Sequence, residues 1–301
     1  MNSKRILVTG ATGFIGSALF RRLKADGHAA DGISLHGGIV DGEEISSVDI
    51  NSEEALLRYF SDRSYKAIFH TAACIPHMSG TQVFEDCFYP NISSVKNIAK
   101  LTARDRNCHL IYASSAAVYG RNKELPLNES SLPMPENYYA LSKYIGELVC
   151  QLYDSQLPVT VFRISSPYGP GYNRMSVINL FCKHALMSRD LQLLGSGKRS
   201  QDFVFIDDIV DAFLLSFKNR CPGVFNLCSG ESISMQGLAE LIISLVPDSR
   251  SKLIFSEKID PQENFRARYS TDNVSRVLGF SPKMIVNEGL KETLSWWITQ
   301  L

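Results

Sequence analysis

The sequence predicts an α/β fold, with a doubly wound parallel sheet followed by a smaller C-terminal lobe. In the first half of the 301-residue chain, short β-rich apolar runs alternate with segments of helical periodicity. This alternation is the pattern of βαβ units and a parallel sheet. It breaks at Tyr168-Gly169-Pro170-Gly171, and the elements beyond are shorter. A chain of this length forms one large domain or two smaller ones.

The elements of the first half are predicted from local apolar patterns. Strands are short β-rich runs, and helices place apolar residues three or four positions apart. We expect strands at residues 6–8, 33–35, 48–50, 67–70, 110–113 and 159–164. We expect helices at residues 14–25, 83–104 and 136–153, and a loop over the polar stretch 37–44. The crossovers between parallel strands should be right-handed.

The second half supplies the smaller lobe. We expect helices at residues 177–187, 209–217, 235–246, 272–278 and 288–298, and strands at 191–194, 203–206 and 253–255. The boundary then falls after residue 165. Residues 1–165 form the sheet domain, which takes one later segment near 203–230, and residues 166–301 mainly form the lobe.

Composition excludes several classes of protein. Lysine and arginine number 31, as do aspartate and glutamate, so the basic excess of a nucleic-acid binder is missing. No apolar run approaches the roughly 20 residues that span a bilayer. The seven cysteines show no CxxC spacing, and the histidines form no HxxxH pair, so we expect reduced thiols, a cytoplasmic location and no metal site.

A glycine-rich turn follows the first predicted strand. Residues 9–16 read TGATGFIG and open the predicted helix 14–25. Gly10 permits a tight turn, Gly13 lets the backbone approach a pyrophosphate, and Gly16 allows close packing of helix on strand. The free N–H groups of the helix N-terminus then face the phosphates. The first domain is therefore predicted to be a Rossmann-type dinucleotide-binding domain.

A second motif carries acid–base chemistry. Tyr139 and Lys143 form a YxxxK pair, and side chains four positions apart on a helix share a face. A nearby cation favours the phenolate and lowers the pKa of a tyrosine. The phenol can then exchange a proton with a substrate hydroxyl as a hydride leaves or arrives.

Together these motifs resemble the extended short-chain dehydrogenase/reductase family, in particular its NAD-dependent nucleotide-sugar epimerases and dehydratases. SSAAVYG at residues 114–120 resembles the family's S-x-x-VYG segment, which makes Ser115 the third catalytic residue beside Tyr139 and Lys143. Tyr119 is then structural. RISSPYGPG at 163–171, the segment 195–208 and GVFNLCSG at 223–230 resemble further family segments, so the likeness covers nearly the whole chain.

The resemblance also implies binding residues. The cofactor-binding set is Gly10, Thr12, Gly13, Phe14, Ile15, Gly16, Ser34, Asp49, Ile50, Thr71, Ala72, Ala73, Asn91, Tyr139, Lys143 and Pro167. The substrate-binding set is Ser114, Ser166, Arg199, Arg266 and Arg268. Asn91 matches the asparagine that braces the active-site helix, and Asp49 the acid that meets the adenine amino group.

Five positions depart from the family pattern. Ser34 replaces the acid that binds the adenine ribose in NAD-preferring members, which leaves NADP open as the cofactor. We still expect NAD. Ala116 and Ala117 replace the Asp-Glu pair of 4,6-dehydratases. Ser166 replaces an asparagine, and Gln201 replaces an arginine that grips a substrate phosphate.

The resemblance therefore implies an epimerase that acts on a nucleotide sugar by hydride transfer at C4. The alternatives are a 4-ketoreductase that consumes NAD(P)H, an oxidoreductase on a substrate without a nucleotide, and a nicotinamide-sensing protein without turnover. The family often dimerises through the helices predicted at residues 83–104 and 136–153, so we expect a homodimer.

Overall fold

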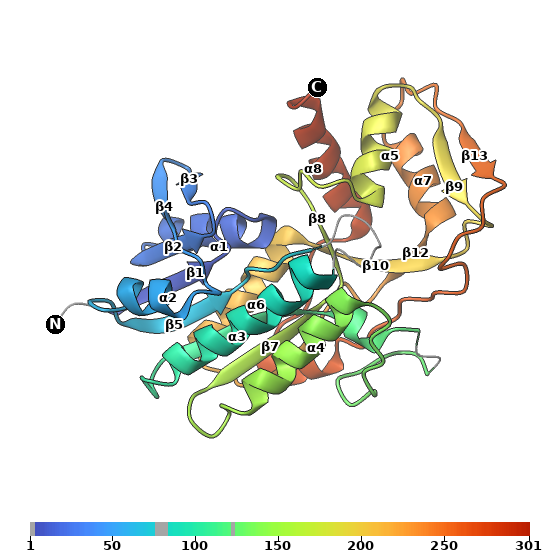
Figure 1. The fold of residues 1–301 in the computed structure, drawn as a ribbon. Coiled ribbons are helices and arrows are strands. Elements are labelled where there is room, and N and C mark those ends of the chain that lie inside the picture. Colours follow the sequence, from blue (N-terminus) through green and yellow to red (C-terminus); the bar gives the residue numbers. More distant parts are fainter. Residues whose placement is uncertain (1–3, 76–83, 122–123) are drawn as a thin grey trace.

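The computed structural model describes residues 4–75, 84–121 and 124–301. Its main sheet has eight strands in the order β11-β7-β6-β5-β1-β2-β4-β3 (Figure 1). The strands are β1 Arg5–Thr9, β2 Ala30–Ser34, β3 Gly38–Val40, β4 Glu43–Ser47, β5 Tyr65–His70, β6 His109–Ser115, β7 Val159–Ile164 and β11 Gly223–Leu227. All neighbours pair parallel except β3 and β4, which pair antiparallel. The predicted parallel α/β sheet is confirmed.

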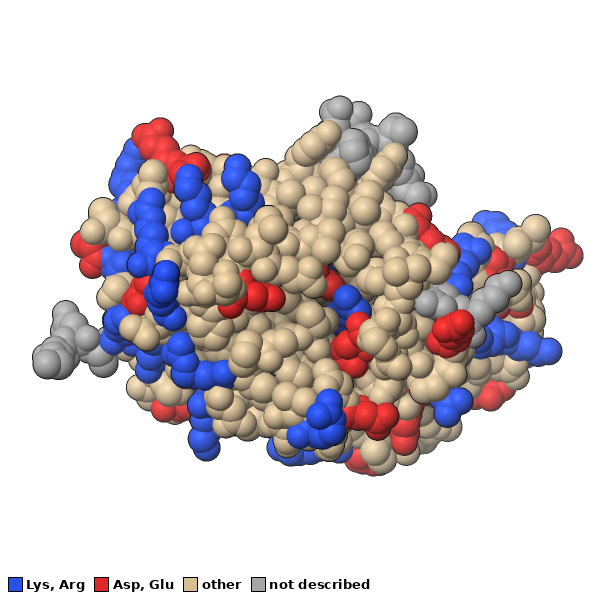
Figure 2. All heavy atoms as spheres, turned by 90° about the horizontal axis from the view of Figure 1, so that it is seen from below, with Lys and Arg blue, Asp and Glu red and all other residues tan. Residues whose placement is uncertain are grey.

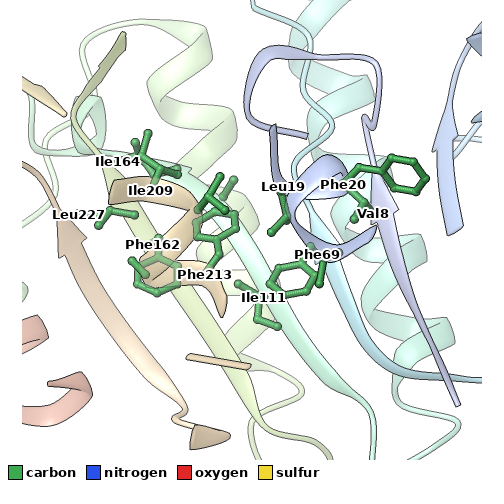
Figure 3. Packing of buried hydrophobic residues seen from close by; sticks show 14 of the residues in the cluster. Val8, Leu19, Phe20, Phe69, Ile111, Phe162, Ile164, Ile209, Phe213 and Leu227 are labelled. Carbon is green, nitrogen blue, oxygen red and sulfur yellow. The ribbon is translucent and has the colours of Figure 1, made fainter. Parts of the chain in front are cut away.

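Helices cover both faces of this sheet. The helices of this domain are α1 Phe14–Ala25, α2 Glu53–Tyr59, α3 Tyr89–Thr102, α4 Tyr138–Gln151 and α6 Ile206–Asn219. Short helical turns lie at Phe84–Phe88, Ala116–Tyr119 and Val274–Leu278. Because successive strand residues point to opposite faces, Leu7 packs in the cluster that includes residues of α3. Ile6 and Val8 pack in the cluster of α1 and α6, in which Figure 3 shows Val8 with Leu19, Phe20 and Ile209. The hydrophobic runs of buried strands thus build two cores.

The smaller lobe has its own sheets and core. It holds β8 Ser166–Tyr168, β9 Leu191–Leu194, β10 Ser200–Phe205, β12 Ser232–Ser234, β13 Leu253–Ser256, α5 Val177–Leu186, α7 Met235–Ser244 and α8 Val286–Ile298. β12, β10 and β8 form one sheet, and β13 with β9 another. The chain returns to the main sheet through α6 and β11 (Figure 1). The predicted boundary at residue 165 stays a prediction, although β8 begins one residue later in the small sheet.

Two local predictions are wrong. The polar stretch 37–44 is the hairpin β3–β4 and not a loop, and residues 48–50 form no strand. Val40 pairs with Glu43, so Asp41-Gly42 makes a two-residue turn with positive φ at both positions. Asp-Gly favours such turns. Two ion pairs, Arg21 with Asp41 and Lys24 with Glu43, connect the hairpin to α1.

The prediction of wholly reduced thiols is also wrong. Cys74 and Cys87 form a disulfide between the loop after β5 and the turn before α3. The remaining cysteines are free, and most are buried. None of the helices in the described ranges combines the length and apolar character that crossing a membrane requires.

Candidate functional site

The glycine-rich turn lies between β1 and the N-terminus of α1. Gly10 has φ +69°, and a Cβ there would lie 2.7 Å from Cα of Ala72. A Cβ on Gly16 would lie 2.1 Å from the carbonyl oxygen of Gly10. Gly13 caps α1 without any side-chain hydrogen bond, which leaves its first N–H groups free for an anionic ligand. Backbone geometry and helix polarity therefore fit a pyrophosphate.

The ends of neighbouring strands bring other predicted cofactor residues to this turn. Thr71 donates a hydrogen bond to the carbonyl of Thr9 at 2.6 Å, and the Ala72 N–H donates to the Thr9 hydroxyl at 3.3 Å. This joins the ends of β5 and β1, where dinucleotides bind in open parallel sheets. Thr12 lies beside the β3–β4 hairpin, because a Cβ on Gly38 would lie 3.1 Å from its methyl group.

The remaining predicted cofactor residues differ in their surroundings. Ser34 ends β2 and donates its hydroxyl to the carbonyl of Gly37 at 3.1 Å. Asp49 is exposed and accepts a hydrogen bond from the N–H of Asn51. Ile50 and Ala73 are half-buried in loops, and Pro167 lies in β8 opposite Val204.

The catalytic candidates converge where β6 ends and α4 begins. Ser115 is the last residue of β6, and its hydroxyl accepts a hydrogen bond from the N–H of Ala117 at 3.2 Å. Asn137 caps α4 by accepting a hydrogen bond from the N–H of Ala140 at 2.9 Å, so Tyr139 lies in the first turn. Lys143 is 3% exposed and lies one turn further along. The structure thus brings the three predicted residues together.

The electrostatics differ from what the YxxxK spacing predicts. Burial raises the pKa of Tyr139 to about 12, against smaller lowering effects of the Ser115 hydrogen bond and of Arg174. Burial also lowers the pKa of Lys143 to about 8. The Lys143 ammonium donates to the carbonyl of Ala113 at 2.8 Å and lies 5.9 Å from the centre of the Tyr139 ring. Burial therefore has a larger effect than Lys143 on the pKa of this tyrosine, and the tuning role of Lys143 stays a prediction.

Asn91 joins the cofactor edge to the catalytic helix. Its amide oxygen accepts from the N–H of Cys74 at 2.8 Å, and its amide nitrogen donates to the carbonyl of Cys74 and to the hydroxyl of Ser142, both at 3.0 Å. Ser142 precedes Lys143 on α4. The side chain of Asn91 therefore connects the loop after β5 to the helix of Tyr139.

Ser114 does not reach the substrate side, and this prediction is wrong. Its side chain is buried on the opposite face of β6 and donates to Glu147 at 2.5 Å. Glu147 also pairs with Arg163 at 2.7 Å, and both side chains are nearly inaccessible. The Arg163 guanidinium also donates a hydrogen bond to the Tyr119 hydroxyl at 3.0 Å. A buried polar network therefore lies behind the catalytic helix.

The predicted substrate residues of the lobe are mostly engaged with protein groups. Gln201 donates to the hydroxyl of Ser166. Arg199 pairs with Asp260 at 3.0 Å, so its charge is already balanced. Arg266 is exposed and donates to backbone carbonyls of its own segment, and Arg268 is exposed as well.

The sequence predictions missed two residues in the loop between β8 and α5. The Tyr172 ring lies 4.6 Å from that of Phe14, the first residue of α1. Arg174 donates to the carbonyl of Ile75, in the loop after β5, at 3.1 Å. The YGPG break places this loop at the junction of the lobes. That position was the signal from which Tyr172 and Arg174 could have been found.

The glycine-rich turn gives a first prediction. Gly16→Ala should weaken NAD binding by about tenfold or more and destabilise the fold by about 1–3 kcal/mol, because the new methyl group collides with the carbonyl of Gly10. Calorimetry with NAD and a urea titration would measure both effects. Gly237→Ala, in α7, is the matched control and should leave NAD binding unchanged. A Gly16→Ala protein that binds NAD normally would contradict the assignment of this turn.

Known proteins share this architecture. A model of the NAD dependent epimerase/dehydratase family matches residues 6–228. The chain belongs to that family.

The chain is 30% identical over 312 residues to GDP-mannose 3,5-epimerase 1 of Oryza sativa subsp. indica, covering 97% of this chain and 81% of the relative. It is 28% identical over 317 residues to dTDP-D-glucose 4,6-dehydratase of Homo sapiens, covering 98% and 90%. UDP-glucose 4-epimerase of Thermotoga maritima superposes with a TM-score of 0.88 at 25% identity, covering 98% of this chain and 99% of that structure.

As a member of the NAD dependent epimerase/dehydratase family, the chain is an enzyme of the extended short-chain dehydrogenase type that uses NAD. The geometry agrees with this cofactor. Cβ atoms would fill the cradle at Gly10 and Gly16, and the first N–H groups of α1 remain free. Around Ser34, which is predicted to meet the adenine ribose, residues 32–40 contain no Asp, Glu, Lys or Arg.

Proposed function

We propose that the enzyme epimerises a nucleotide sugar at C4. The observation that carries the proposal is the placement of Ser115 at the end of β6, of Tyr139 in the first turn of α4, and of the buried Lys143 one helical turn further along. The side chains after Ser115 are methyl groups, those of Ala116 and Ala117. Methyl groups transfer no protons, which disfavours elimination of water. The likeness to a UDP-glucose 4-epimerase supports the same reaction.

The residues of this site divide the work of the reaction. Ser115 would hold the C4 oxygen of the sugar against Tyr139, whose phenolate oxygen takes the hydroxyl proton. NAD bound at the glycine-rich turn would supply the acceptor and then the donor of the C4 hydride, and the keto sugar would have to turn over between the two transfers to present its other face. Tyr139 then gives its proton back to the same oxygen, so no net oxidation results. Lys143 would hold the nicotinamide ribose and add positive charge near Tyr139 as the phenolate forms.

The substrate is proposed to be a nucleotide diphosphate sugar, like those named for the relatives. Two phosphates require cationic partners when they are removed from water. Gln201 supplies no charge and Arg199 is paired with Asp260, which leaves Arg266 and Arg268 as the proposed phosphate contacts among the predicted set.

A homodimer through α3 and α4 is proposed as the working form. Leu148 in α4 and Leu152 at its C-cap are 41% and 73% exposed, which leaves apolar side chains on the outer surface at this end of the helix. Figure 2 shows, on the face seen from below, a broad area without Lys, Arg, Asp or Glu. Sedimentation of the wild type and of a Leu148→Glu, Leu152→Glu variant would test it.

The reaction is tested with UDP-glucose, dTDP-glucose and GDP-mannose in the presence of NAD. Epimerisation should produce the C4 epimer by NMR, without net change in the absorbance of reduced nicotinamide. Stoichiometric consumption of NADH with a 4-keto sugar would instead identify a ketoreductase. A 4-keto-6-deoxy product would identify a dehydratase. Turnover of none of the three sugars would count against the nucleotide-sugar substrate.

Lys143→Met should affect both cofactor and rate. The thioether keeps the length of the buried stem but removes the ammonium. Loss of a charged hydrogen bond costs about 1.5–3 kcal/mol, so the Kd for NAD should rise about 10–100-fold, and kcat should fall. Calorimetry and steady-state kinetics measure the two effects. An unchanged Kd would show that Lys143 does not hold the ribose.

A further inference from the structure

The buried ammonium of Lys143 has two neighbours on β6. It donates a hydrogen bond to the carbonyl of Ala113 at 2.8 Å, and it lies over the ring of Tyr112, 5.0 Å from the ring centre. An ammonium has three N–H donors, and among the described residues the carbonyl of Ala113 is its one hydrogen-bond acceptor. The face of an aromatic ring attracts a cation at this distance, most strongly where water is excluded. The ring of Tyr112 is therefore the second group that holds this charge.

Tyr112 contributes its ring and not its hydroxyl. The residue is 1% exposed, and its hydroxyl oxygen finds no hydrogen-bond partner in the part of the chain that the structure describes. A buried polar group without a partner costs free energy. What Tyr112 offers to its surroundings is therefore an aromatic face.

Close packing from two elements fixes the place of this ring. A Cβ on Gly146 of α4 would lie 2.4 Å from the Tyr112 hydroxyl oxygen and 2.9 Å from Cζ of the ring, so the absence of a side chain lets α4 approach β6. His70 pairs with Tyr112 on the neighbouring strand β5, and their rings stack with 5.6 Å between centres. His70 is in turn hydrogen-bonded to the hydroxyl of Thr9, at the start of the glycine-rich turn, at 2.8 Å. The ring thus connects this turn to Lys143.

The surroundings leave the ring to stabilise the ammonium. Burial lowers the pKa of Lys143 to about 8, so this side chain is mostly charged at pH 7. Burial lowers the pKa of His70 to about 3, so His70 adds no like charge beside it. Glu147 lies one turn further along α4, but its carboxylate pairs with Arg163. No carboxylate of residues 4–75, 84–121 and 124–301 forms an ion pair with Lys143.

We propose that Tyr112 is a positioning residue for Lys143, whose ammonium is held by the face of the Tyr112 ring where it can donate to the nicotinamide ribose. This inference rests on the ribose-binding role proposed above for Lys143. A lysine side chain is a flexible four-carbon stem, and the carbonyl of Ala113 fixes only one of its N–H groups. The ring restrains the ammonium on a second side and leaves a donor for the cofactor.

Fluorination of the ring tests its electrons apart from its shape, because fluorine withdraws electron density from the face and adds little volume. The variants are Tyr112→Phe, its 3,5-difluoro and 3,4,5-trifluoro forms, and Tyr112→Leu. Tyr112→Phe should bind NAD like the wild type, since it keeps the ring and loses only the hydroxyl. In Tyr112→Leu the ammonium occupies the binding position for a smaller fraction of the time, so the Kd for NAD should rise about tenfold. The fluorinated rings should give Kd values that rise with the number of fluorines toward that of Tyr112→Leu.

Calorimetry with NAD at pH 7 measures the Kd values, and thermal unfolding shows whether each protein is folded. The matched control is the same trifluorinated ring at Phe217, whose centre lies 5.6 Å from the ammonium of Lys66. That protein should bind NAD with an unchanged Kd. In a Lys143→Met protein, fluorination at position 112 should have no effect on the Kd, since the ring acts through the ammonium.

Equal Kd values across the phenylalanine series would overturn the inference, and so would a full fluorine effect in the Lys143→Met protein. If Tyr112→Leu does not fold, the fluorinated series decides by itself. An unchanged Kd in Lys143→Met would overturn the proposed ribose contact of Lys143 and, with it, this inference. A raised Kd in Lys143→Met beside a flat fluorine series would overturn the inference alone, so the two failures are distinguishable.

Discussion

Tyr139→Phe should abolish turnover while leaving the fold and NAD binding almost intact. The ring is half-buried in the first turn of α4 and phenylalanine fills the same space. Only the phenol oxygen is lost. General acid–base groups contribute about 10²–10⁴-fold, so kcat should fall by that factor with a nearly unchanged Kd for NAD.

The matched control is Tyr138→Phe, which makes the same change one position earlier, where the ring contacts Phe88. It should retain most of the activity. Steady-state kinetics, calorimetry with NAD and thermal unfolding of both variants separate the loss of a proton-transfer group from a loss of structure. Wild-type kcat in a pure, folded Tyr139→Phe protein would exclude this residue as the acid–base group.

The parallel α/β architecture was predictable because its signals are local. β7 and β9 begin and end where the apolar runs do, and α1 covers the residues of helical periodicity. The glycine spacing likewise predicts the turn that α1 opens, since a backbone collision excludes side chains there. Short-range patterns of this kind are set by a few neighbouring residues.

The missed elements have tertiary causes. β11 adds to the edge of the main sheet beside β7, although 58 or more residues separate them in the chain. The hairpin β3–β4 is polar and is held by ion pairs to α1. The Asp-Gly turn was a usable signal for it, but apolar periodicity does not register a polar strand.

The sequence predicted which residues come together at the site better than it predicted the pKa of Tyr139. Ser115, Tyr139 and Lys143 converge as the motif spacing implies, yet burial and not Lys143 dominates the pKa of the phenol. The orientation of the Ser114 side chain follows from strand alternation, because successive residues of a strand point to opposite faces and Ser114 therefore points away from its neighbour Ser115. The contact of Arg174 with the carbonyl of Ile75 joins separate lobes, and no local pattern predicts contacts of this kind.

The buried network behind α4 should make the stability of the domain sensitive to the loss of either charged partner. Arg163 and Glu147 are held by three hydrogen bonds from the guanidinium to the carboxylate, and Ser114 donates to the same carboxylate. The two side chains are only 6% and 2% exposed. Removal of one partner leaves an uncompensated charge in the interior, which costs far more than the pair itself contributes.

Arg163→Met should therefore lower the free energy of unfolding by about 3–5 kcal/mol. Arg58→Met is the matched control, because Arg58 and Glu54 form an ion pair whose side chains are 77% and 83% exposed. That variant should lose at most about 0.5 kcal/mol. Adding Glu147→Met to Arg163→Met should recover much of the loss, since the double variant buries no unpaired charge. Urea unfolding of the four proteins, wild type included, measures these differences. An Arg163→Met protein within about 1 kcal/mol of the wild type would show that water reaches the carboxylate of Glu147 when its partner is removed.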